Sequence, residues 1–235
     1  MTEVEWLVAD SPWPMLSHLE GESRERKLRL LACHCCRRIR HIIPAEEARR
    51  CIEVAELYAE GLASRDDLDA SIRNSMEACV KLPIPRGKDV SDAINAVSRM
   101  HRSRDGGRSL CHGLAASAWA TSEASRARRS DESADEFNAR RERLFEEEFA
   151  RQARLFREVF GNPFRPVSFS PSWRTETALI LARQMYESRD FSLMRILADA
   201  LQDAGCEDEQ ILNHCHHDGP HVRGCWVVDL VLDKE

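Results

Sequence analysis

A segment near the carboxyl terminus concentrates side chains that bind metal ions. The stretch ILNHCHHDGPHVRGC, residues 211–225, holds four histidines and two cysteines. Imidazole nitrogen and thiolate sulfur are the donors that structural zinc prefers, four of them around one ion. His221 and Cys225 are four residues apart, so they share a face if a helix begins near Pro220. Cys215 precedes them across the short loop HHDGP.

This pattern predicts a structural zinc site close to the carboxyl terminus. Its ligands are Cys215, His221 and Cys225, with Cys206 or His214 as the fourth. The segment lacks the C-x-x-C spacing of many structural zinc sites. In the alternative, no metal binds and the three cysteines of this set lie in an apolar core, while His216 and His217 face solvent.

A second group of cysteines lies in ACHCCRRIRH, residues 32–41. Neighbouring residues of a helix point about 100° apart, so these thiols cannot all meet one ion. Cys35 falls on the apolar stripe of the predicted helix, whereas Cys33 falls on the polar side with Arg37. Arginine there would lower the thiol pKa of Cys33 and make it reactive. Unreactive core cysteines are the favoured interpretation.

Two charged segments offer further functions. Residues 24–41 carry seven basic side chains and one acidic one, a pattern that could bind nucleic acid. No helix-turn-helix, aromatic stacking or zinc-finger signature accompanies them, so a solvated helix face is favoured. The carboxylates of Glu142, Glu146, Glu147 and Glu148 are predicted to lie outside a long helix, paired with neighbouring arginines.

Helices must position nearly all of these residues, because apolar residues recur every three or four positions. Capping residues, glycine and proline separate the helical runs. The predicted helices begin near Thr2, Pro12, Ser23, Pro44 and Ser64, and then cover 89–101, a segment through Trp119, 131–160, 175–187, 190–204 and 208–215. The β-branched residues of 222–232 suggest a strand, but their spacing by four favours a helix.

Composition limits the class of protein. The chain has 235 residues, 43% hydrophobic and 31% charged, with a net charge of −6, which is typical of a globular protein without general affinity for nucleic acid. No apolar run reaches the roughly 18–20 residues that cross a bilayer, and the first residues lack a secretory signal. We therefore expect a cytoplasmic protein without membrane contact, whose nine cysteines are thiols or metal ligands.

Several passages resemble a family of uncharacterised bacterial proteins common in planctomycetes. They are MTEVEWL, RKLRLLACHCCRRI, VFGNPFRPV, ILADALQDAGCEDEQIL and GPHVRGCWVVDLVL. The resemblance runs over most of the chain and is weakest between residues 81 and 130. It implies a shared fold and transfers no catalytic residue.

The sequence predicts an all-α protein, an orthogonal or bundle-like array of helices with three parts at 1–82, 83–160 and 161–235. These parts would form one compact unit or two packed helical subdomains. The expected function is a binding or regulatory module with a protein partner. The alternatives are a small metal- or thiol-dependent enzyme and a nucleic-acid-binding protein acting through 24–41. The chain lacks the P-loop, H-E-x-x-H and G-x-S-x-G motifs.

Overall fold

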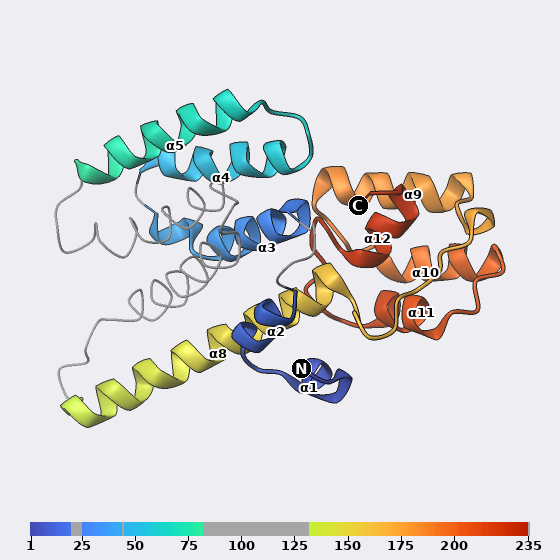
Figure 1. Ribbon diagram of the computed structural model, residues 1–235, viewed down its shortest axis with the longest axis horizontal. Helices are drawn as coiled ribbons and strands as arrows, with labels where there is room; N and C mark the ends of the chain where they lie inside the picture. Colours follow the sequence, from blue (N-terminus) through green and yellow to red (C-terminus); the bar gives the residue numbers. More distant parts are fainter. Residues whose placement is uncertain (20–24, 44, 82–131, 235) are drawn as a thin grey trace. The chain divides into compact units, whose positions relative to one another are not determined.

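The described part of the protein is helical. A computed structural model describes residues 1–19, 25–43, 45–81 and 132–234, and the helices predicted at 89–101 and through Trp119 lie outside these ranges. Within them the chain forms ten α-helices and no strand (Figure 1). The all-α prediction is therefore confirmed for the described residues.

Most helices begin and end near the predicted positions. Their bounds are α1 Glu3–Val8, α2 Pro12–Leu19, α3 Glu25–Arg38, α4 Glu46–Ala59, α5 Arg65–Val80, α8 Ala134–Phe160, α9 Glu176–Ser188, α10 Met194–Asp203, α11 Glu209–His216 and α12 Trp226–Leu232. Short 3-10 helices cover Arg40–Ile42 and Pro171–Trp173. The carboxyl-terminal run is a helix, as predicted, but it begins at Trp226 and leaves Pro220 in the preceding loop.

Side chains cap several helix starts where backbone N–H groups lack a helical partner. Thr2 and Glu5 form a capping box, with the Thr2 N–H donating to the Glu5 carboxylate at 2.7 Å and the Glu5 N–H to the Thr2 hydroxyl at 3.3 Å. Ser64 and Asp67 repeat this arrangement before α5. Asp208 accepts from two N–H groups at the start of α11, the helix that carries His214.

The chain divides into two compact units. Unit 1 contains residues 8–153 with Met1, and unit 2 contains residues 2–7 and 154–235. Helix α8 contributes its residues up to Ala153 to unit 1 and its last two turns to unit 2. The division into 1–82, 83–160 and 161–235 stays a prediction, because residues 82–131 are outside the described ranges.

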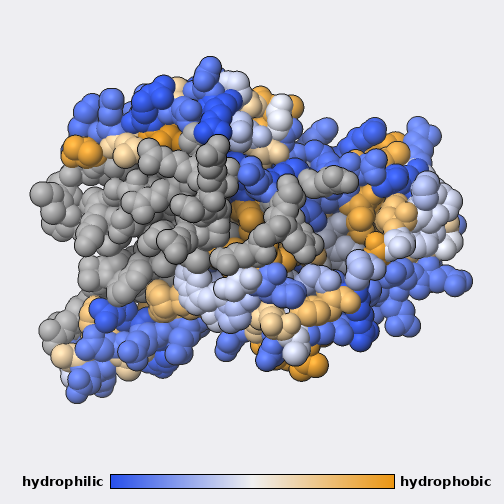
Figure 2. All heavy atoms as spheres, in the orientation of Figure 1, coloured by the Kyte–Doolittle hydropathy of each residue, from blue (hydrophilic) through white to orange (hydrophobic). Residues whose placement is uncertain are grey.

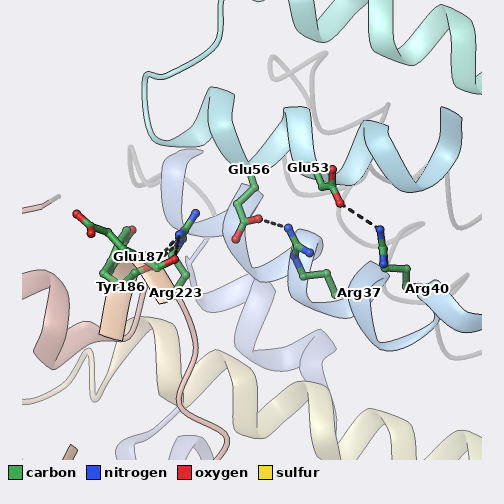
Figure 3. Close-up of polar contacts among 7 residues, drawn as sticks. All are labelled: Arg37, Arg40, Glu53, Glu56, Tyr186, Glu187 and Arg223. Atoms are coloured by element: carbon green, nitrogen blue, oxygen red, sulfur yellow. Dashed lines mark hydrogen bonds and ion pairs between the residues drawn. The ribbon is translucent and has the colours of Figure 1, made fainter. Parts of the chain in front are cut away.

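Unit 1 is built on α3, α4 and α5. Its core consists of apolar residues and three cysteines of α3 and α4: Cys33, Cys36, Ile39, Ile43, Ala45, Ala48, Cys51, Ile52, Ala55, Leu68 and Ile72. Arginines of α3 and the following turn pair with glutamates of α4, including Arg37 with Glu56 and Arg40 with Glu53 at 3.2 Å (Figure 3). These ion pairs flank the apolar contact between the two helices.

Unit 2 gathers α9, α10, α11 and α12 around one core (Figure 1). The core includes Met185, Leu197, Ile211 and Val228, all buried. Helix α1 joins this unit through Trp6, whose indole N–H donates to the carbonyl of Gly161 at 2.9 Å. Gly161 ends α8 with a φ of 65°, a conformation in which glycine carries no steric cost.

The surface carries mixed polarity. On the face shown in Figure 2, hydrophobic residues form separate spots among hydrophilic ones over the described helices. Within the described residues, no helix combines the length and the apolar composition that crossing a bilayer requires.

The phenylalanines of α8 are buried to different degrees. Phe156 is fully buried and Phe160 nearly so, and their rings lie 5.9 Å apart between centroids. Phe145 and Phe149 are half-buried and make edge contacts, with Phe149 also 5.3 Å from the ring of Trp13. Among these rings, deep burial is therefore confined to the carboxyl-terminal end of α8.

We expect Phe156→Ala to lower the free energy of unfolding by about 3–5 kcal/mol, because it leaves a cavity in a close-packed core. Phe149→Ala should cost less, since part of its ring is already exposed to water. Urea unfolding followed by circular dichroism measures both values. Equal losses in the two variants would contradict the difference in burial.

Candidate metal centre

Four potential metal ligands meet in unit 2. They are Glu158 in the last turn of α8, His214 in α11, His221 in the loop before α12 and Cys225 at the residue that precedes α12. One ligand atom from each lies within 4.8 Å of all the others. A tetrahedral zinc ion with donors about 2.0–2.3 Å away holds those donors about 3.3–3.8 Å from one another. The four atoms are therefore nearly as close to one another as the donors of a tetrahedral zinc site.

The contacts within this group, which we call the Glu158 cluster, are direct. Glu158 places one carboxylate oxygen 3.2 Å from Nδ1 of His221 and the other 3.4 Å from Nε2 of His214. The same Nε2 of His214 lies 3.1 Å from the sulfur of Cys225. The backbone N–H of Val222 also donates to Glu158, at 3.4 Å. Both sides of the carboxylate are thus engaged.

The loop that carries His221 and Cys225 is fixed to helices on either side. Arg223 donates to the carbonyl of Tyr186 at 2.7 and 3.0 Å and to that of Glu187 at 3.4 Å, at the end of α9 (Figure 3). These carbonyls belong to the last turn of a helix and lack partners along it. Loop residue Asp218 forms an ion pair with Arg195 of α10. The loop ligands are therefore held in place by contacts outside the cluster.

Burial and charge oppose each other at Glu158. Burial alone would raise the pKa of this carboxyl, but hydrogen bonds from His214 and His221 outweigh it and lower the pKa to about 2. Burial would lower the pKa of His221, yet Glu158 raises it. In the cluster without metal, the charge of Glu158 therefore favours the protonated form of His221.

At Cys225, burial and the nearby charge act in the same direction on the pKa. Burial and the negative charge of Glu158 raise the pKa of its thiol well above the ordinary value. The side chain is fully buried. Cys225 is therefore a neutral thiol until a cation lowers its pKa.

The structure brings together three of the five residues proposed as ligands from the sequence. His214, His221 and Cys225 belong to the cluster. Cys206 and Cys215 lie outside the cluster, in the apolar core of unit 2 that Cys225 also joins, and Cys215 is on another side of α11 from its neighbour His214. His216 and His217 are exposed, as predicted. Metal binding itself stays a prediction.

His221 and Cys225 are not arranged on one helix as the sequence predicted. His221 lies in the loop and Cys225 precedes the first residue of α12, so the two do not share a helix face. They approach each other because the loop folds back toward α8. A backbone hydrogen bond from Cys225 to the carbonyl of Val222 closes its last turn at 2.9 Å.

Glu158 was missed because it lies more than fifty residues before the histidines. One signal was available in the sequence. Within LFREVF, residues 155–160, the acidic side chain falls among positions that the apolar spacing assigns to the buried face of α8. The structure buries Leu155, Phe156 and Val159 together with Glu158. A charged residue at such a position needs a partner, and a histidine-rich segment can supply one.

Two other sequence interpretations are corrected. Cys33 does not lie on the polar side of α3 but is fully buried, and burial raises the pKa of its thiol to about 12. Both observations argue against a reactive thiolate at Cys33. Glu148 does not lie outside α8 but is fully buried, where Arg38 donates to both of its oxygens at 3.1 and 2.9 Å.

The basic helix α3 is largely neutralised by partners. Arg26 pairs with Glu60 at 3.1 Å, and Arg37 and Arg38 pair with the buried carboxylates of Glu56 and Glu148. Side chains committed to internal ion pairs are not available for phosphates. This supports the solvated-face interpretation over nucleic-acid binding.

The Glu158 cluster has the composition of a ligand set more than of a thiol enzyme. In a cysteine–histidine–acid triad, the acid orients the base through the nitrogen opposite the one that meets the thiol. Here Glu158 and Cys225 both face Nε2 of His214. The buried neutral thiol is a poor nucleophile as well. Four donors would fill a tetrahedron and leave no open position for substrate.

In metal-free protein, we expect Glu158→Gln to lower the free energy of unfolding by about 1.5–3 kcal/mol, because it removes hydrogen bonds to a charged group. The pKa of Glu158 is lowered from 4.5 and that of His221 raised from 6.5. Their pairing therefore stabilises most between about pH 4.5 and 6.5 and is lost as the pH rises through the raised pKa of His221. Chemical unfolding of the parent and the variant across and above this pH range measures the difference in unfolding free energy. A difference that does not change with pH would contradict the pairing.

Comparison with known proteins does not assign this site. No family model, curated protein or solved structure matches the chain. The resemblance to the planctomycete proteins stays an expectation. The case for the site therefore rests on the donor atoms that the chain itself brings together.

Proposed function

We propose that unit 2 binds one divalent ion of the zinc class at Glu158, His214, His221 and Cys225, and that the ion stabilises a helical binding or regulatory module. The observation that carries this proposal is the approach of four donor atoms, from three separate segments, to within 4.8 Å of one another. Cysteine, histidine and carboxylate are the ligand types of protein zinc sites.

The charges of the cluster support a divalent ion. A carboxylate, a thiolate and two neutral imidazoles carry two negative charges, which one divalent cation balances. Without metal, protonation of His221, which Glu158 favours, would balance the carboxylate instead. Both states are electrically neutral, so neither leaves an uncompensated charge in the buried site.

The donor types support zinc over other divalent ions. Calcium and magnesium take six or more oxygen ligands, and this cluster offers carboxylate oxygen from a single residue. Thiolate and imidazole suit zinc, and four donors match its tetrahedral preference. Cobalt(II) has a similar preference and serves as a coloured probe of the same site.

The ion would add stability by joining segments that are distant in the chain. Glu158 ends a long helix, whereas His214 and Cys225 lie on either side of the last loop. An ion that requires this folded arrangement contributes its binding free energy to folding. The shape of unit 2, and any protein surface that it presents to a partner, would then depend on the ion.

We expect the purified full-length protein to bind one zinc ion, and Glu158→Gln, His221→Ala and Cys225→Ala each to weaken binding at least tenfold. Each variant removes a ligand atom, so zinc should no longer raise its melting temperature as it does for the parent. Calorimetric titration of chelator-treated protein measures affinity, and differential scanning calorimetry measures the melting temperature.

Two variants serve as matched controls. Cys215→Ala removes a buried thiol outside the cluster, and His216→Ala removes an exposed imidazole. Both should bind zinc like the parent. Unchanged zinc affinity in Cys225→Ala, or loss in Cys215→Ala, would show that the ligand set is wrong.

Zinc affinity should fall as the pH falls. Binding must displace a proton from the thiol of Cys225 and another from His221, whose pKa values are both raised. The sign follows directly, because protons compete with the ion for these atoms. Titrations in buffers of different ionisation enthalpy count the protons released. Affinity independent of pH between 6 and 8 would contradict coordination by Cys225 and His221.

A further inference from the structure

Trp226 contacts His214, one of the candidate ligands, through the ring nitrogen that faces away from the cluster. Trp226, the first residue of α12, places its indole Nε1 3.0 Å from Nδ1 of His214, with the ring centroids 5.2 Å apart. The indole N–H can only donate a hydrogen bond. Nδ1 of His214 is therefore the acceptor and carries no hydrogen in this arrangement.

This hydrogen bond determines which nitrogen of His214 carries the proton. In a neutral imidazole with an acceptor at Nδ1, the hydrogen is on Nε2. Nε2 is the nitrogen that faces the sulfur of Cys225 and the carboxylate of Glu158. The proton thus occupies the position where an ion would bind, and His214 donates into the cluster instead of coordinating.

His221 has the opposite arrangement. Its Nε2 lies 3.0 Å from the carbonyl oxygen of His217, which can only accept, so Nε2 carries a hydrogen. Its Nδ1 faces the carboxylate of Glu158. An imidazole that donates outward to a carbonyl and turns its other nitrogen inward is the usual form of a metal ligand. His221 can therefore coordinate after losing only the proton of Nδ1, with its outer hydrogen bond kept, whereas His214 cannot keep its hydrogen bond with Trp226.

We propose that zinc coordination by His214 and the hydrogen bond from Trp226 exclude each other, so that the metal site is a switch that displaces Trp226 when the ion binds. The inference rests on the proposed zinc site. Coordination through Nε2 requires that nitrogen to give its proton to solvent and Nδ1 to take one from solvent. Two N–H groups then face each other at 3.0 Å, which is repulsive.

The displaced indole would affect contacts beyond the site. The ring of Trp226 lies against Gly161, where a side-chain Cβ would come within 3.1 Å of the indole. The carbonyl of Gly161 accepts the hydrogen bond of Trp6, the buried residue of α1. A shift of Trp226 therefore alters the contact at the end of α8 to which α1 is attached, and links the bound ion to the N-terminal helix.

The switch predicts that Trp226→Phe tightens zinc binding by about two- to tenfold. The variant removes a hydrogen bond that exists only without the ion, and such a bond changes an equilibrium by about this factor. A residue that merely supported the ligand geometry would have the opposite effect when removed. Competition between a chelator and chelator-treated full-length protein, with zinc as the probe, measures the affinity.

Trp173→Phe is the matched control. Trp173 belongs to unit 2 and packs against Phe169, and it does not take part in the cluster. Its variant should bind zinc like the parent, and circular dichroism should show parental helix content in both. Zinc affinity that is unchanged or weaker in a folded Trp226→Phe protein would overturn the switch.

A measurement on the parent protein gives a second test if the variant fails to fold. With ¹⁵N-labelled tryptophan, the indole N–H signal of Trp226 should move upfield on adding zinc, because its hydrogen bond is lost. A bound ion with an unmoved signal would overturn the switch and leave Glu158, His221 and Cys225 as the ligands from the cluster. A parent protein that binds no zinc would contradict the proposed site itself.

Discussion

Neutralising the buried carboxylate of Glu158 is the constraint on which the rest of unit 2 depends. An unpaired carboxylate in an apolar interior costs several kcal/mol, so side chains from other segments must reach it. His214 and His221 do so, and each is held by its own contacts: His214 by α11 and Trp226, His221 by the carbonyl of His217. Most other conformations of the loop between α11 and α12 would expose the carboxylate of Glu158 or leave it without a partner.

Local contacts hold the loop in the position where His221 can neutralise Glu158. Arg223 binds carbonyls at the end of α9, and Asp218 pairs with Arg195 of α10. These contacts supply partners for helix-end carbonyls and at the same time set the positions of His221 and Cys225 on either side of Arg223. The cluster is thus assembled mainly by backbone capping and loop anchoring, with the donor atoms brought together as a consequence.

Sequence patterns predicted the positions of the helices better than the contacts between distant segments. Helical periodicity and capping boxes located α1, α5 and α9 closely because these signals act over three or four residues. The approach of Glu158 to His221 depends on how α8 meets a loop sixty residues later, which no local pattern encodes. The same limit explains Cys33 and Glu148, since periodicity assigns one face of a helix to the core while a second packed helix buries another.

The side chains that neutralise buried carboxylates differ between the two units. In unit 2 they are of a kind that can exchange protons for a metal ion. In unit 1, Glu56 and Glu148 are each fully buried beside an arginine, Arg37 and Arg38. Arginine stays charged at all relevant pH values and cannot coordinate a metal, so these pairs are permanent. Glu158 instead meets two imidazoles and a thiol, which can release protons and bind a cation in their place. An arginine would neutralise Glu158 at least as well, so stabilising the charge alone does not account for this set of side chains. The proposed metal ion would account for it.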